Sequence, residues 1–118
     1  MKILVVDDSK AMRMIVKRTL RQAGFGDAEV QEANNGAEGL DAVKASPPDI
    51  VLCDWNMPEM SGIEFLKALR AEGIDVKFGF ITSVATPEIT EEGTAAGASF
   101  VIGKPFSADK LKSSIEGA

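Results

Sequence analysis

The sequence contains no histidine, and Cys53 is its only cysteine. The absence of histidine excludes histidine-ligated metal sites, Ser-His-Asp triads and Cys-His nucleophile pairs within the chain. A single cysteine cannot close a disulfide within the chain, which is typical of proteins in a reducing compartment. We expect Cys53 to be a buried structural thiol.

Long apolar stretches and an excess of positive charge are also missing. No apolar run approaches the ~20 residues that span a bilayer, and Met1–Val6 is too short for the core of a signal peptide. Lys and Arg total 13 against 18 Asp and Glu, and a net charge of −5 argues against non-specific nucleic-acid binding. No segment has the basic amphipathic pattern of a membrane-surface helix. We expect a cytoplasmic protein that binds neither nucleic acid nor membranes, and we expect a monomer.

The chain has 118 residues, of which 45% are hydrophobic, enough for the core of one domain. It shows no linker, repeat or low-complexity tract, so one domain is expected over residues 1–118. Short apolar runs alternate with segments whose apolar residues recur at helical spacing. The apolar runs are Ile3–Val6, Ala28–Ala33, Ile50–Cys53, Val76–Ile81 and Ser99–Ile102. Five strands alternating with five helices predict a doubly wound α/β fold with a parallel sheet.

Turn and capping residues support these boundaries. Gly24 follows the first helical segment, Asn34-Asn35 offers an N-cap for the second, and Ser107 offers one for the fifth. The fourth helix is expected over Thr86–Ala96, with Pro87 as its first residue. It has a weak helical propensity, because it contains β-branched residues and a glycine. Two interpretations remain open: packing supports a poor helix, or the helix is a mobile element.

Polar residues mark four of the five strands at the end where ligands bind in parallel α/β sheets. Asp7 and Asp8 follow the first strand, and Asp54 follows the third. Thr82 ends the fourth strand, and Lys104 follows the fifth. Each residue alone has an ordinary explanation as a cap, a strand residue or a surface charge. Their succession at four strand ends is much more specific, and we expect them to converge on one corner.

Three carboxylates at one corner repel one another, and the single charge of Lys104 leaves the cluster negative. A hard divalent cation, Mg²⁺ or Mn²⁺, suits oxygen ligands and the remaining charge. A carboxylate can also act as a nucleophile and form an aspartyl phosphate, a reaction that depends on positioning and charge stabilisation. The corner therefore predicts phosphoryl transfer to Asp54. The metal would lie between Asp8, Asp54 and a phosphoryl oxygen, with Lys104 and Thr82 on other oxygens.

Three motifs resemble the response-regulator receiver family, and the resemblance covers essentially the whole chain. Similarity to the CheY-like chemotaxis receivers in particular rests on the Asp-Trp-Asn-Met-Pro stretch and on Met12-Arg13. The resemblance implies a flavodoxin-like fold of five βα units with the strand order 2-1-3-4-5. The motifs are Leu4-Val5-Val6-Asp7-Asp8-Ser9, Asp54-Trp55-Asn56-Met57-Pro58-Glu59-Met60-Ser61-Gly62 and Lys104-Pro105-Phe106.

The family pattern implies that Asp54 accepts the phosphoryl group from a phosphohistidine on a partner histidine kinase. Thr82 would bind the group and help switch conformation, while Lys104 would contact the group and precede a cis peptide bond to Pro105. The output would be a phosphorylation-dependent protein interaction in chemotaxis or motility, with a flagellar motor switch protein as target. The metal ligands that the pattern implies are Asp7, Asp8, Asp54 and the backbone carbonyl of Asn56.

Two positions depart from the family pattern. Three residues before Lys104 the family usually has an aromatic residue or histidine that switches rotamer together with the threonine, whereas this chain has Val101. Strand alternation directs Phe100 to the opposite face, so we expect Phe100 in the core rather than as a displaced switch. Two residues after Thr82, Val84 stands where CheY-like receivers have an acidic residue near the path of the hydrolytic water. The lifetime of the aspartyl phosphate is therefore expected to differ.

Other functions remain open at this point. A phosphorelay shuttle, a phosphate sink or a receiver excised from a larger regulator would carry the same site. An aspartyl-phosphate phosphatase of the haloacid-dehalogenase type is a remote alternative, because such enzymes place Asp-x-Asp after the first strand and this chain has adjacent Asp7-Asp8. No GxxxxGK[ST] or GxGxxG motif follows that strand to indicate a nucleotide-binding module. We expect a signalling protein that catalyses only its own phosphorylation and dephosphorylation.

Overall fold

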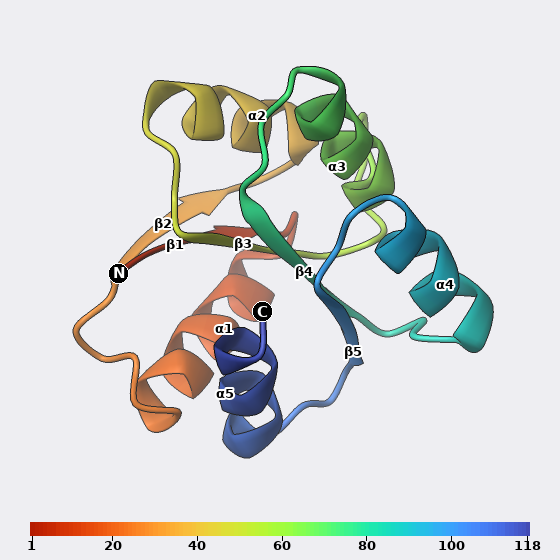
Figure 1. Ribbon diagram of the computed structural model, residues 1–118. Coiled ribbons are helices and arrows are strands. Elements are labelled where there is room, and N and C mark those ends of the chain that lie inside the picture. Colours follow the sequence, from red (N-terminus) through yellow and green to blue (C-terminus); the bar gives the residue numbers. More distant parts are fainter.

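In the computed structural model, which describes residues 1–118, five parallel strands form one sheet in the order β2-β1-β3-β4-β5. Helices α1 and α5 cover one face of the sheet, and α2, α3 and α4 cover the other (Figure 1). The predicted fold class and strand order are confirmed, and no predicted strand end differs from the observed one by more than one residue. The strands are β1 (Lys2–Val6), β2 (Glu29–Ala33), β3 (Ile50–Cys53), β4 (Lys77–Thr82) and β5 (Phe100–Gly103). The helices are α1 (Lys10–Gln22), α2 (Gly36–Ala45), α3 (Gly62–Ala71), α4 (Pro87–Ala95) and α5 (Ala108–Glu116).

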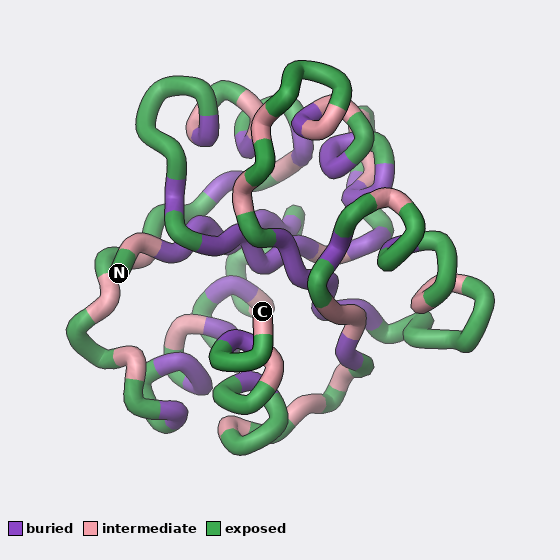
Figure 2. The backbone as a smooth tube through the Cα atoms, in the orientation of Figure 1, coloured by how far each residue is buried: buried purple, intermediate pink, exposed green.

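The sheet separates two apolar clusters, one under each layer of helices. Successive residues of β1 alternate between them: Leu4 and Val6 belong to one cluster, and Ile3 and Val5 to the other. All four are buried, as Figure 2 shows for the central strands. A strand buried on both faces reads as a continuous apolar run, which is why the sequence of β1 does not alternate with polar residues. The residues that follow β1 and β3 thus extend from the most tightly packed part of the molecule.

Helix α4 has few buried residues. Thr86 is its N-cap and Pro87 its first residue, as predicted, but Gly93 is its only buried residue. A Cβ atom at Gly93 would lie 3.1 Å from Val101 and 3.2 Å from Phe80, so glycine permits a close approach of the helix to β4 and β5. Ile89 is partly buried against the same side of the sheet, so the packing of α4 depends on few residues.

Phe100 and Val101 point to opposite faces of β5, as predicted. Phe100 packs against the cluster under α1 and α5, and Val101 packs against the other cluster. Gly79 is the residue of β4 that pairs with Phe100, and a Cβ atom there would lie 2.1 Å from the Phe100 ring. The ring thus fills space above a glycine, which agrees with the prediction that Phe100 is a core residue.

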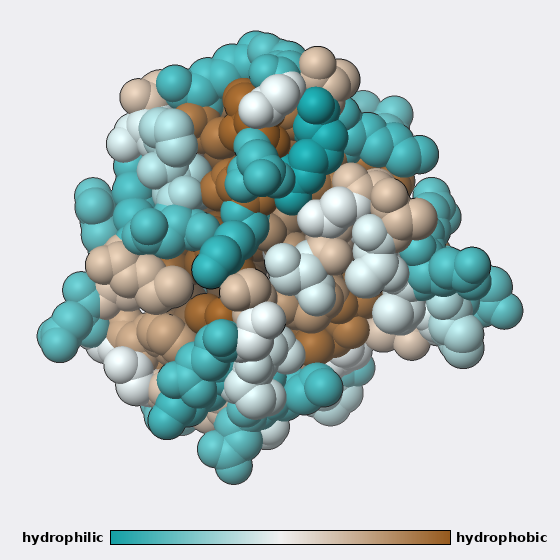
Figure 3. Space-filling model, viewed as in Figure 1, coloured by the Kyte–Doolittle hydropathy of each residue, from teal (hydrophilic) through white to brown (hydrophobic).

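The outer surface is mainly polar. Figure 3 shows one face on which hydrophilic residues form most of the rim and apolar residues lie nearer the middle. The large apolar residues that are exposed are Met1, Met14, Ile15 and Val84. None of the helices combines the length and the apolarity needed to span a membrane.

Candidate functional site

Three carboxylates meet where β1 and β3 end. These strands are parallel neighbours, and Val6 pairs with Cys53, so the next residues of each strand lie side by side. Asp7, Asp8 and Asp54 each contribute one carboxylate oxygen, and these oxygens all lie within 4.8 Å of one another. The structure therefore brings together the three carboxylates that the sequence places at separate strand ends.

Lys104 brings one positive charge to this cluster. Its Nζ atom lies 3.3 Å from Asp7 Oδ2 and 3.5 Å from Asp54 Oδ1. The side chains of Lys104, Asp7 and Asp54 are 19%, 6% and 14% exposed, so the ion pairs are only weakly screened by solvent. The Lys104-Pro105 peptide bond is cis, as the family pattern implies. One ammonium group faces three carboxylates, which leaves the cluster with excess negative charge.

Thr82 lies at the adjacent end of β4. It is fully buried and pairs with Gly103, and its carbonyl accepts a hydrogen bond of 2.9 Å from the Lys104 backbone N–H. Its Oγ1 accepts a hydrogen bond of 3.2 Å from the backbone N–H of Val84. Thr82 is therefore held next to the lysine, whereas its contact with a phosphoryl group stays a prediction.

Asp7 and Asp8 differ in how many partners they already have. Asp7 Oδ1 accepts a hydrogen bond of 2.9 Å from the backbone N–H of Ser9, and Oδ2 pairs with Lys104. Asp7 is buried, whereas Asp8 is exposed. Asp8 therefore has the more accessible carboxylate of the two. Asn56, whose carbonyl is the fourth predicted ligand, is exposed in the segment that follows β3.

The pKa of the Asp54 carboxyl is raised above its ordinary value, mainly because burial disfavours the charged form. The ammonium of Lys104 opposes this effect, and the neighbouring charge of Asp7 adds to it. The backbone N–H of Trp55 donates a hydrogen bond of 2.8 Å to Asp54 Oδ1, which favours the ionised form. Apart from this shift, one ammonium group facing three carboxylates leaves the cluster short of positive charge. Clustered carboxylate oxygens with uncompensated charge fit a hard divalent cation such as Mg²⁺.

The residues on either side of Asp54 are both buried. The Cys53 thiol donates a hydrogen bond of 3.1 Å to the Asp54 carbonyl, and its pKa is raised well above the ordinary value by burial and by the charges of Asp54 and Asp7. A protonated, buried thiol agrees with the structural role predicted for it. Trp55 packs on Phe80, with ring centroids 4.7 Å apart, and therefore contacts β4 directly beside Asp54 in the chain.

Two residues near the site, Gly62 and Arg13, were not predicted from the sequence to contribute to its structure. Gly62, the first residue of α3, lies against the Asp54 backbone: an added Cβ atom would be 2.1 Å from the Asp54 carbonyl oxygen. Arg13 is only 8% exposed and lies on the buried side of α1 with Val16 and Leu20. The spacing of Arg13 from these two residues is that of one helix face, which is a signal in the sequence that an arginine there needs a buried partner.

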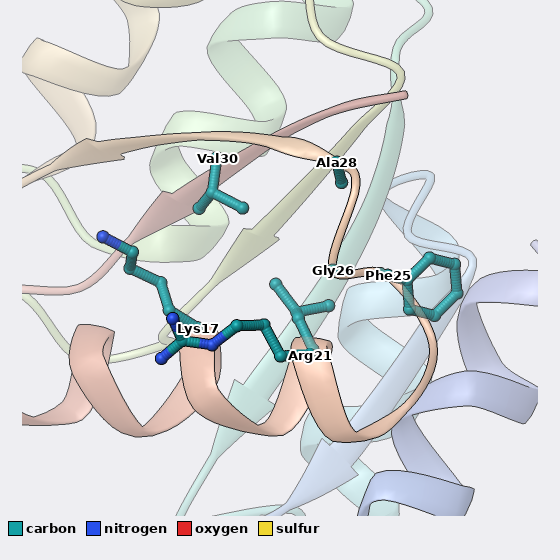
Figure 4. Close-up of a pocket in the computed structure, with 7 residues that line it drawn as sticks. Lys17, Arg21, Phe25, Gly26, Ala28 and Val30 are labelled. Carbon is teal, nitrogen blue, oxygen red and sulfur yellow. The ribbon is translucent and has the colours of Figure 1, made fainter.

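A surface hollow of about 230 Å³ lies elsewhere, between α1 and the start of β2 (Figure 4). Lys17 and Arg21 line it from the helix, and Phe25, Ala28 and Val30 line it from the segment that leads into β2 and from the strand itself. The carboxylates and Lys104 do not line this hollow. It is therefore separate from the acidic cluster.

The fold is a parallel α/β sheet with an acidic cluster and a lysine at the carboxyl ends of its strands. Proteins of this class bind ligands at that edge of the sheet. Residues 3–116 match the family model of the response regulator receiver domain. The chain belongs to the response-regulator receiver family, and it is a receiver of the CheY-like chemotaxis type.

The similar proteins support this assignment. Chemotaxis protein CheY-3 of Vibrio cholerae is 43% identical over 98% of this chain and 89% of the relative. A probable chemotaxis protein CheY of Rhizobium etli is 34% identical over 98% of this chain and 89% of the relative. Among solved structures, the chemotaxis response regulator CheY4 of Vibrio cholerae has a TM-score of 0.84 and 36% identity, over 98% of this chain and 95% of that one. The family resemblance of the sequence is thereby confirmed.

Proposed function

We propose that this receiver takes a phosphoryl group onto Asp54 from a phosphohistidine of a partner histidine kinase, with Mg²⁺ or Mn²⁺ bound to the carboxylates. The observation that carries the proposal is the convergence of Asp7, Asp8 and Asp54 within 4.8 Å around a single lysine. The excess negative charge of this cluster requires a cation before an anionic phosphoryl group can approach. No other three carboxylates in the chain come this close together, and the lysine beside them is partly buried.

Asp54, Lys104 and Thr82 would have different roles in the phosphoryl transfer. The Asp54 carboxylate attacks phosphorus while the bond from phosphorus to the donor nitrogen breaks, a step that requires positioning rather than a base. When bound, Mg²⁺ supplies positive charge that offsets the carboxylates and the phosphoryl oxygens. Lys104 would turn from Asp54 Oδ1 to a phosphoryl oxygen, and the Thr82 hydroxyl would bind another.

The proposed metal ligands follow from the same contacts. Asp8 has an exposed carboxylate and would therefore hold the metal directly, together with Asp54 and the backbone carbonyl of Asn56. Asp7 has both carboxylate oxygens engaged, by Ser9 and by Lys104, and would therefore act through water. Few carboxylates combined with water and phosphate oxygens would suit Mg²⁺.

Incubation with acetyl phosphate and Mg²⁺ followed by intact-mass measurement tests the proposal. We expect one added phosphoryl group on the wild type, none on Asp54→Asn and none when the metal is chelated. The matched control is Asp41→Asn, which removes an exposed carboxylate on α2 and should accept the group normally. A phosphorylated Asp54→Asn protein would place the acceptor elsewhere.

We also propose how the signal leaves the domain. Phosphorylation adds about −1.5 to −2 charge at pH 7, which would bias the segment between β4 and α4 through Thr82. The target would be a protein such as a flagellar motor switch component, and the relatives named as chemotaxis proteins support that choice.

The chain would act as a cytoplasmic monomer formed by one receiver domain over residues 1–118. Val101 would occupy the usual place of the aromatic switch, with Gly93 of α4 as its neighbour.

We expect Val84→Glu to shorten the lifetime of the aspartyl phosphate. Val84 is 38% exposed on the turn after Thr82, and a carboxylate there can accept a hydrogen bond from an incoming water. The rate of phosphate loss should rise on the order of 10-fold. The rate can be followed by Trp55 fluorescence after a pulse of acetyl phosphate, with Val84→Gln as the control of equal size. Equal rates in wild type and Val84→Glu would refute the prediction.

A further inference from the structure

We infer that Arg13 is a positioning residue for the metal site: it fixes the backbone of Asp7, and through it the carboxylates of Asp7 and Asp8, by tying that backbone to Glu32 of the edge strand β2. The inference rests on the proposed metal site. It assigns a task to a residue that touches neither the metal nor the phosphoryl group.

The Arg13 guanidinium lies between two partners. Its Nη1 donates a hydrogen bond of 2.6 Å to the Asp7 carbonyl, and its Nε lies 3.0 Å from Glu32 Oε1. The guanidinium donors have a fixed planar geometry, so the two bonds together set the distance from α1 to the ends of β1 and β2. The side chain is 9% exposed, and water therefore competes little with these bonds.

The backbone of Asp7 is held on both sides. Its N–H donates a hydrogen bond of 3.2 Å to the carbonyl of Ala33, the residue after Glu32, and its C=O accepts from Arg13. The contacts form a closed circuit from Asp7 through Ala33, Glu32 and Arg13 back to Asp7. The peptide planes before and after the Asp7 Cα atom are each held by one hydrogen bond, which leaves the segment of Asp7 and Asp8 little freedom, although three like charges meet there.

Glu32 is suited to anchor the circuit. Burial raises the pKa of its carboxyl, but the bonds from Arg13 and Lys17 outweigh burial and hold the pKa below the ordinary value. Lys17 lies 3.2 Å from Glu32 Oε2 and does not contact Asp7. The two cations thus share one carboxylate, but only Arg13 reaches the site. Lys17 is therefore a natural control for the positioning role.

Two alternative roles of Arg13 predict different results. If its charge alone mattered, removal of a cation near the carboxylates would tighten Mg²⁺ binding, and lysine would replace arginine without effect. If it merely stabilised the fold, substitution would lower the urea midpoint and leave the Mg²⁺ affinity of the folded protein unchanged. A positioning role requires the planar guanidinium group. It therefore predicts that Arg13→Lys does not restore the wild-type behaviour and that the affinity for Mg²⁺ falls.

The test is a Mg²⁺ titration of the metal-free protein, followed by Trp55 fluorescence and repeated by calorimetry. We expect the dissociation constant to rise about 10-fold in both Arg13→Lys and Arg13→Met, as for other residues that hold a metal ligand in place. Glu32→Gln should show a smaller rise, and Lys17→Met should remain within about 2-fold of wild type. Urea unfolding without Mg²⁺ reports any loss of stability separately.

The outcomes distinguish the inference from the function on which it rests. If the wild type fails to bind Mg²⁺, the proposed metal site is wrong. If the wild type binds and Arg13→Lys binds equally well, the site stands and the positioning role is wrong. Tighter binding by Arg13→Met would also overturn it, in favour of a purely electrostatic effect. A non-additive rise in the Arg13→Lys/Glu32→Gln double variant supports the circuit, since both substitutions break the same path.

Discussion

Gly62→Ala should nearly abolish phosphorylation of Asp54 and lower the free energy of unfolding by about 3 kcal/mol. The added Cβ atom would lie 2.1 Å from the Asp54 carbonyl oxygen and 2.9 Å from the Phe80 ring. The carbonyl belongs to the backbone and cannot turn aside as a side chain does. The Gly62 N–H also donates a hydrogen bond of 2.8 Å to the Trp55 carbonyl, so α3 cannot move away without losing that bond. The backbone of Asp54 must therefore shift, and its carboxylate must leave the cluster.

Urea denaturation and the acetyl-phosphate mass assay together measure this effect. Gly26→Ala is the matched control, because nothing lies within 4 Å of its Cβ position and its φ is not positive. We expect that control to retain wild-type stability within about 0.5 kcal/mol and full phosphorylation. If Gly62→Ala folds with wild-type stability and accepts a phosphoryl group at the normal rate, the close packing of α3 on Asp54 has no functional role.

The contrast between Gly62 and the carboxylates shows what the sequence can and cannot predict. Asp7, Asp8 and Asp54 were predictable as one cluster, because each ends a buried strand and parallel strands end at the same edge. The closeness of Gly62 to Asp54 was not, because the path of the segment between them depends on local geometry. That segment includes Glu59, which has a positive φ of 69° although it is not a glycine. Nothing in the residue type of Glu59 indicates that conformation.

Arg13 illustrates a second limit. Its place on the buried face of α1 could have been read from the spacing to Val16 and Leu20, and that spacing requires a buried partner. The identity of the partner could not, since it depends on the register in which β2 pairs with β1 and on the direction of the Arg13 side chain. The spacing predicts that Arg13 needs a buried partner, and only the structure identifies the partners as Glu32 and the Asp7 carbonyl. The opposite orientations of Phe100 and Val101, by contrast, follow from strand periodicity alone and were predicted.

Lys104→Met should destabilise the metal-free protein by about 2 kcal/mol at pH 7, with the loss shrinking as the pH falls. The side chain pairs with both Asp7 and Asp54, which are largely shielded from water, and methionine would leave these carboxylates unpaired. The same substitution should slow phosphorylation about 100-fold, because a cation placed to stabilise the developing charge is lost.

The pH dependence follows from Asp54. Its pKa is raised in the folded protein, mainly by burial, and Lys104 lowers it, so Lys104→Met raises it further. Between the unfolded pKa of about 3.9 and the folded pKa, the folded protein holds a proton that the unfolded chain has lost. Stability that is present at acid pH is therefore lost as the pH rises through this window, and the variant loses more because its window is wider. Urea unfolding between pH 4.5 and 7.5 without Mg²⁺ should show the two proteins diverging toward neutral pH.

Mg²⁺ should then reduce the difference in stability between Lys104→Met and the wild type. A cation bound only to the folded state stabilises it, by about 2.7 kcal/mol at 100 times its dissociation constant, and the variant leaves the cluster with more negative charge to attract it. Lys44→Met is the matched control, because Lys44 forms an exposed ion pair of 2.9 Å with Glu72, a class of contact that contributes about 0–1 kcal/mol. That control should show neither the pH divergence nor the Mg²⁺ rescue. If Lys104→Met behaves like Lys44→Met, the lysine does not balance the carboxylate charge, and the electrostatic basis of the proposed metal site is wrong.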